Sequence, residues 1–174
     1  MRARRFHRAM RVAVLAMLGG GLICLTPAPV AANGGNGVKA AMIYNILRFM
    51  TLPDARPRVR LCVRRADELA PDLLSLNGEP VGAGQLEVVP LANLTDARGC
   101  DALYVGNAPI TSAPAPGRGQ VLIGDGGHFA EDGGTVGLIS FGGQTRFAIN
   151  ARVAAHSGVR ISSQVMRLAA RIVN

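Results

Sequence analysis

The sequence predicts an α/β fold: a mostly parallel sheet with a C-terminal antiparallel hairpin and helices on both faces. Three observations support it. Short apolar runs alternate with helical or loop segments, which is the pattern of parallel strands joined by crossovers. The runs 103–105 and 121–123 are apolar without alternation, as in strands buried on both faces. The apolar segments 135–141 and 145–150 are separated by Gly142-Gly143-Gln144, which is typical of a hairpin.

The first expected element is an amphipathic helix over 38–49. Its apolar residues recur at three- and four-residue spacing, and Pro53 prevents continuation of the helix. A strand is expected at 58–63, and then a helix over 65–76 that is broken or restarted at Pro71. Asn77-Gly78 predicts a turn ahead of the next strand.

The second half of the chain continues the alternation. Further strands are predicted at 85–91, 101–105 and 120–123. The segment 109–117 holds three prolines, so we expect a loop there with at most one helical turn. After the hairpin, a helix is expected from about 151, interrupted near Gly158 and resumed over 162–172, with Ser162 or Ser163 as its N-cap.

Residues 1–32 have the pattern of a cleavable secretory signal peptide. Five arginines without an acidic residue precede an apolar run, 12–25, which is shorter than the roughly 20 residues of a membrane-spanning helix. Val30 and Ala32 suit the −3 and −1 positions of a cleavage site. An uncleaved membrane anchor is the alternative interpretation. We therefore expect export to the periplasm and a single α/β domain over 33–174.

Composition excludes one class of function. The net charge of +8 comes from 19 basic and 11 acidic residues, but five of the basic residues lie in the signal segment. The remainder carries about +3, which together with export argues against nucleic-acid binding. Aromatic residues make up 4% of the chain and Trp is absent, which disfavours a carbohydrate-stacking surface.

The cysteines predict one disulfide. Cys24 lies within the signal segment, which leaves Cys62 and Cys100 in an oxidising compartment. Two interpretations stay open for this bond: a structural cross-link, and a redox-responsive bond that adjusts activity.

Three blocks together resemble the YfiR-like family of periplasmic regulators. The helix segment 38–49 (VKAAMIYNILRF) is similar to the family's opening pattern, although the aromatic residue that normally precedes the following proline is missing. The strand carrying Cys62 and the later segment 99–105 (GCDALYV) form the second block. The third block is listed here in chain order: Ile123-Gly124-Asp125, Phe129, Gly133-Gly134, RFAIN at 146–150 and ISS at 161–163.

The resemblance implies a non-enzymatic repressor. Members of this family hold an inner-membrane diguanylate cyclase of the YfiN type inactive through its periplasmic domain, and an outer-membrane YfiB-type protein or redox stress relieves the repression. The resemblance also implies a homodimer. The alternative is a periplasmic small-ligand binding module that reports to a membrane sensor kinase or transporter. This alternative needs a convergent polar pocket at the strand C-termini, for example near Asp125 and Asn107.

The partner-binding surface is expected on the first helix and on two basic residues. Met42, Ile46 and Phe49 give this helix more apolar surface than one core face needs, although core packing is the alternative. Arg60, in a dense arginine cluster, could approach an acidic partner surface or anionic lipid headgroups, and Arg146, on a strand, could contact an anion or a partner; solvated sheet positions are the alternative.

The sequence predicts no catalytic residue, no metal ligand set and no cofactor. His128 lies near Asp125, Glu131 and Asp132, but no metal-binding spacing supports a site there, and no nucleophile is spaced beside a base. We expect this segment to be a polar, glycine-rich turn.

Overall fold

The computed structural model describes residues 35–54 and 56–174. The predicted signal peptide and its cleavage site lie outside these residues. Within the described part of the chain, no helix is long and apolar enough to cross a membrane.

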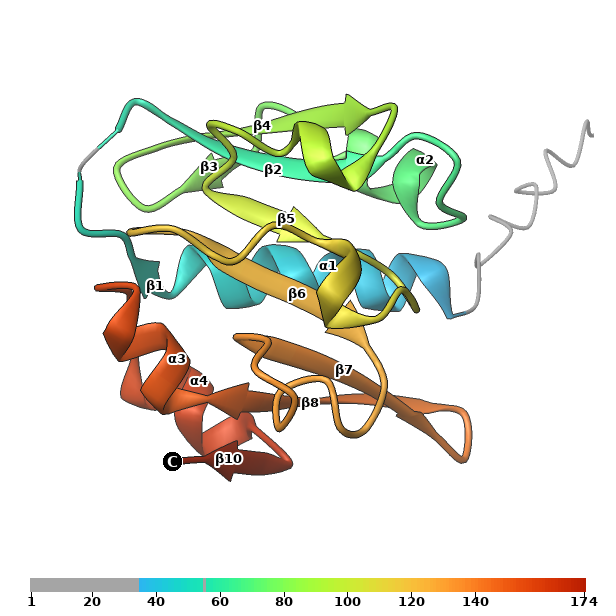
Figure 1. Ribbon diagram of the computed structural model, residues 1–174, viewed down its shortest axis with the longest axis vertical. Coiled ribbons are helices and arrows are strands. Elements are labelled where there is room, and N and C mark those ends of the chain that lie inside the picture. Colours follow the sequence, from blue (N-terminus) through green and yellow to red (C-terminus); the bar gives the residue numbers. More distant parts are fainter. Residues whose placement is uncertain (1–34, 55) are drawn as a thin grey trace, which may run out of the picture. The chain divides into compact units, whose positions relative to one another are not determined.

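Eight strands form the main sheet, in the order β10-β8-β7-β6-β5-β2-β4-β3 (Figure 1). The five parallel strands are β2 (Arg58–Arg64), β4 (Gly84–Leu91), β5 (Ala102–Tyr104), β6 (Val121–Asp125) and β7 (Val136–Phe141). The antiparallel strands are β8 (Gln144–Asn150), which forms the predicted hairpin with β7, and β3 (Pro80–Val81) at one edge. The predicted fold class is confirmed.

Alternation along the central strands divides the core between the two faces of the sheet. Leu61 and Val63 of β2 pack in one apolar cluster, whereas Cys62 between them packs in the other, because successive side chains point to opposite faces. The first face is covered by α1 (Asn36–Arg48) and α2 (Ala70–Leu74). The second face is covered by two 3₁₀ helices, η1 (Leu94–Asp96) and η2 (Ile110–Ser112), and by loops.

The second predicted helix is shorter than expected. α2 occupies only Ala70–Leu74 of the segment 65–76, with Pro71 in its first turn, as a restart at that proline requires. The proline-rich segment 109–117 holds a single 3₁₀ turn, as predicted. With so little helix on the second face, its apolar contacts come from short turns.

The C-terminal prediction is partly wrong. After α3 (Ala151–His156), the helix resumes as α4 (Ser163–Leu168) with Ser162 as its N-cap, but it ends at Leu168 rather than at 172. Residues Arg171–Val173 form β10, which pairs in parallel with β8. The Ala170 amide donates to the Phe147 carbonyl at 2.8 Å. Pairing with the otherwise open edge of β8 therefore replaces the last helical turn.

A second, small sheet ties the C-terminal region to the end of α1. β1 (Met50–Thr51) pairs antiparallel with β9 (Arg160–Ile161). Asn150 fixes the turn from β8 into α3, because its side chain accepts from the Val153 amide at 2.9 Å and donates to the Ala130 carbonyl at 2.7 Å. These contacts hold α4 beside α1 and so form the first candidate surface.

Candidate functional site

The disulfide joins Cys62 of β2 to Cys100, which lies just before β5, with a Cα–Cα distance of 5.9 Å. Cys62 is fully buried and Cys100 is 7% exposed, and both pack in the apolar cluster on the second face. Such burial shields the bond from soluble thiols, since exchange requires access to a sulfur. The packing therefore favours the structural interpretation over the redox-responsive one.

An apolar groove of about 570 Å³ runs between α1 and α4. Its floor includes Phe147 of β8, and three of its apolar side chains are well exposed: Leu168 (74%), Val38 (53%) and Phe49 (42%). The complete lining is Val38, Ala41, Met42, Asn45, Ile46, Phe49, Phe147, Gln164, Val165 and Leu168. An apolar surface of this kind is typical of a site where another molecule docks.

Met42, Ile46 and Phe49, the α1 residues predicted to bind a partner, differ in how exposed they are. Met42 is half-buried and Phe49 is exposed, and both line the groove. Ile46 also lines it but is only 2% exposed, because it packs in the main core beneath α1. Ile46 can therefore form the floor of a docking site, whereas Phe49 and Leu168 can be covered by a partner.

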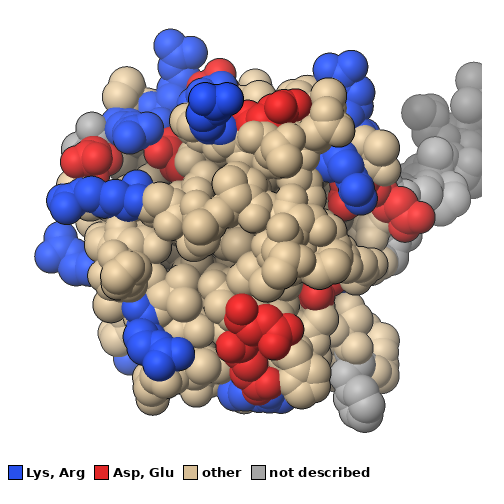
Figure 2. All heavy atoms as spheres, in the orientation of Figure 1, with Lys and Arg blue, Asp and Glu red and all other residues tan. Residues whose placement is uncertain are grey.

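The two predicted basic residues do not line the groove. Arg60 lies on β2, where its guanidinium donates to the Gly99 carbonyl at 3.2 Å and pairs with Glu87 at 3.6 Å. Arg146 lies on β8 and donates to Gln144 at 3.2 Å. Lys and Arg side chains gather on the side of the molecule where β2 begins (Figures 1 and 2). The pairing of Arg56 with Asp101 at 3.0 Å neutralises part of that charge.

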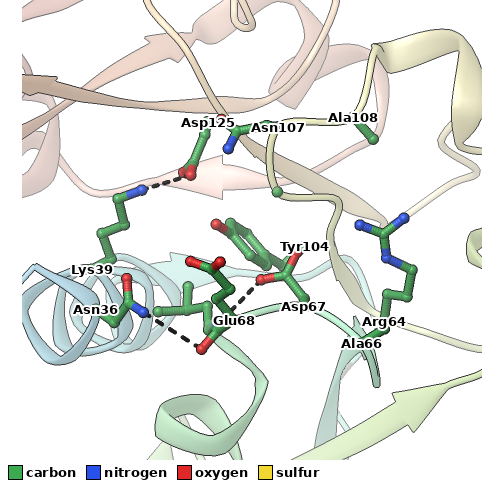
Figure 3. Close-up of a pocket in the computed structure, with 12 residues that line it drawn as sticks. Asn36, Lys39, Arg64, Ala66, Asp67, Glu68, Tyr104, Asn107, Ala108 and Asp125 are labelled. Carbon is green, nitrogen blue, oxygen red and sulfur yellow. Dashed lines mark hydrogen bonds and ion pairs between the residues drawn. The ribbon is translucent and has the colours of Figure 1, made fainter.

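A second candidate site is a polar pocket of about 470 Å³ at the carboxyl ends of β2, β5 and β6 (Figure 3). The chain passes from β2 to β4 on one side and then returns to β5 on the other, so the pocket lies where the strand order reverses. Ligand sites of parallel sheets concentrate at such positions. Asp125 and Asn107, which the sequence placed near such a pocket, both line it.

Charged groups converge inside this pocket (Figure 3). Lys39, from the start of α1, pairs with Asp125 at the end of β6 at 2.6 Å. Burial raises the pKa of the Tyr104 hydroxyl, and the neighbouring Asp125 and Asp67 raise it further. A tyrosine hydroxyl is protonated at neutral pH, and the raised pKa extends this state to more alkaline pH, so Tyr104 presents a neutral donor beside the two carboxylates.

Sequence reasoning missed Lys39, Arg64 and Tyr104 as pocket residues. Arg64 and Tyr104 are the last residues of β2 and β5, so the rule on strand ends could have found them. Lys39 could not be found in this way, because its approach to Asp125 depends on how α1 packs across the sheet.

The glycine-rich turn after β6 carries an exposed ion-pair cluster. His128 contacts Glu131 at 2.6 Å, and Arg171 of β10 also pairs with Glu131. The hydrogen bonds from His128 and then Arg171 lower the pKa of the Glu131 carboxyl. In the described part of the chain, no group of three or more His, Cys, Asp or Glu residues is arranged to hold a metal ion.

Comparison with known families identifies the chain. A family model described as YfiR/HmsC-like matches residues 36–170, which is nearly all of the described chain. The chain belongs to this family. The family match confirms the resemblance noted from the sequence. The opening helix, the cysteine-bearing strand and the hairpin all lie within the matched region.

Other comparisons add little about this YfiR/HmsC-like protein. No curated protein matches it. A conserved domain protein from Vibrio cholerae O1 biovar eltor is 12% identical with a TM-score of 0.46, over 80% of this chain and 60% of that structure. An ABC domain in complex with L-Trp from Streptococcus pneumonia is 10% identical with a TM-score of 0.46, over 79% and 60%. The chain thus spans about 60% of each structure, and similarity this low carries no information on function.

Proposed function

We propose that this YfiR/HmsC-like protein is a non-enzymatic periplasmic regulator that binds an inner-membrane signalling protein and holds it inactive. The partner is the periplasmic domain of a diguanylate cyclase of the YfiN type. Membership of the family supports the regulatory role. The apolar groove between α1 and α4 supports docking as the means by which it acts, and it is the observation that carries the proposal.

The groove offers a surface that folding alone does not explain. Leu168 of α4 is 74% exposed, and Val38 and Phe49 of α1 are about half exposed. Burying a side chain of this size contributes about 1.5–3 kcal/mol, so three of them can anchor a partner. A partner segment with apolar side chains would fit between the helices.

Repression then follows from unequal affinity. A regulator shifts its partner toward the inactive state only by the difference between its affinities for the two partner states. An outer-membrane YfiB-type protein that competes for the same groove would release the cyclase. A second copy of the chain in the groove would produce the homodimer that the resemblance implies, and it would also block docking.

Deleting the gene in a strain that keeps the native partner genes is expected to raise cellular cyclic di-GMP, and restoring the chain should reverse the rise. A version that lacks residues 1–32 serves as the control, because it has the same domain without the predicted export signal. It should fail to restore repression. Unchanged cyclic di-GMP after deletion would contradict the cyclase assignment, and full repression by the truncated control would contradict a periplasmic site of action.

A further inference from the structure

The polar pocket holds two buried groups that lack partners. Among the described residues, the buried side-chain nitrogen and oxygen atoms without a hydrogen bond include Arg64 Nε and Asp125 Oδ1, and both residues line this pocket. Buried polar groups in native proteins are nearly always paired with protein, water or ligand. Two such groups of opposite charge in one cavity are complementary to a molecule that supplies a donor to one and an acceptor to the other.

The carboxylate end of the pocket is built around Asp125. Its side chain is 9% exposed, and Lys39 contacts Oδ2 at 2.6 Å, which leaves Oδ1 free to accept. Asp125 and Asp67 both lie close enough to the Tyr104 hydroxyl to act on its charge state. With two carboxylates and only one paired ammonium, this end of the pocket favours a second cationic donor.

The loop after β5 approaches Asp67 closely at this end of the pocket. Gly106 has a φ of +63°, and a Cβ there would collide with the Asp67 carboxylate. A glycine at this position lets the loop after β5 approach Asp67 closely. Asp67 is held in turn by the Leu69 amide, which donates to its Oδ1 at 2.9 Å.

The opposite end of the pocket favours an anion. Arg64 closes β2 and presents a guanidinium whose Nε has no acceptor. Arg64 therefore supplies a positive charge away from the Lys39–Asp125 ion pair (Figure 3).

We propose that this pocket binds a small solute that carries both a protonated amine and a carboxylate. The amine donates to Asp125 Oδ1, and the carboxylate accepts from Arg64. The cavity volume of about 470 Å³ falls within the range of small-molecule sites. The proposal goes beyond the regulatory function and does not depend on it, because the pocket and the apolar groove share no lining residue.

Calorimetric titration of the purified, oxidised protein tests the proposal with defined probes. The probes are glycine, 4-aminobutyrate and 6-aminohexanoate, which space the two charges differently. Butylamine and butyrate each carry only one of the charges. At least one amino acid should bind about tenfold or more tightly than either single-charge probe, since each end supplies a charge-assisted hydrogen bond.

Two matched pairs of variants locate the binding. Asp125→Asn and Arg64→Gln should each weaken binding of the best probe about tenfold or more. Asp132→Asn and Arg65→Gln, which remove the same charges outside the pocket, should leave it unchanged. Circular dichroism identifies any variant that fails to fold, and the remaining pair then decides. Absence of binding by all three amino acids, equal binding of butylamine or butyrate, or insensitivity to both pocket variants would each overturn the proposal.

Discussion

Loss of the Cys62–Cys100 disulfide is expected to lower the free energy of unfolding by about 4 kcal/mol. The two cysteines are 38 residues apart, and closing a loop of that length removes roughly this much chain entropy from the unfolded state. The bond also joins β2 to the start of β5, two neighbouring central strands. The whole free energy of unfolding of a small domain is only about 5–15 kcal/mol. Losing about 4 kcal/mol should therefore leave the reduced protein close to unfolding at growth temperature.

Urea unfolding of the oxidised protein, the reduced protein and the Cys62→Ala/Cys100→Ala variant measures this contribution. Oxidised and reduced wild type differ only in this bond. Reductant should not change the free energy of unfolding of the double variant, which has no disulfide to lose. A difference below about 1 kcal/mol between oxidised and reduced protein would contradict the expected loop-closure contribution. A reduced protein that stays folded yet no longer represses would instead favour the redox-responsive interpretation.

Gly134→Ala is expected to destabilise the fold by about 3 kcal/mol through a clash with Phe129. Phe129 is 6% exposed and its ring lies against both Gly124 and Gly134. A Cβ on Gly134 would overlap the ring and lie 2.9 Å from the Phe129 carbonyl oxygen, a distance that side chains do not reach without movement of the backbone. Phe129 packs in the same cluster as the disulfide, so the second face would open.

A double-mutant cycle separates this clash from a general loss of glycine. Phe129→Leu shortens the side chain, so Gly134→Ala should cost clearly less in that background than in wild type. Gly127→Ala is the matched control, because a Cβ there meets no atom within 4 Å and its φ is not positive. If Gly134→Ala and Gly127→Ala have equal effects on thermal unfolding, the packing described for Phe129 is wrong.

Local patterns predicted most of the sheet. The strand expected at 58–63 is found as Arg58–Arg64, and the expected hairpin is found as β7 and β8. These elements carry their signal in their own residues, as alternation or apolar runs. β10 carries no such signal: the segment 162–172 has helical spacing, and only contact with the edge of β8 makes its end a strand. Nonlocal pairing of this kind overrides local propensity.

Each candidate site likewise has a part that the sequence predicts and a part that depends on tertiary packing. The apolar excess on α1 predicted one wall of the groove through Met42 and Phe49, whereas the opposite wall, with Leu168, depends on how α4 packs against α1. Asp125 and Asn107 were predictable for the polar pocket because Asp125 ends β6 and Asn107 lies in the loop after β5. The unpaired state of Arg64 Nε and Asp125 Oδ1 is a property of the packed interior, which no sequence pattern reports.

The central claim, that repression acts through the α1–α4 groove, is tested most directly by cyclic di-GMP in deletion strains that carry Leu168→Asp or Phe49→Asp. Both side chains are exposed, so the variants should fold, and a charge in the groove should prevent docking. Leu74→Asp is the matched control, because Leu74 is 40% exposed on α2 and outside the groove. We predict that cyclic di-GMP stays high with both groove variants and falls to the wild-type level with Leu74→Asp. Full repression by folded Leu168→Asp and Phe49→Asp proteins would contradict the account.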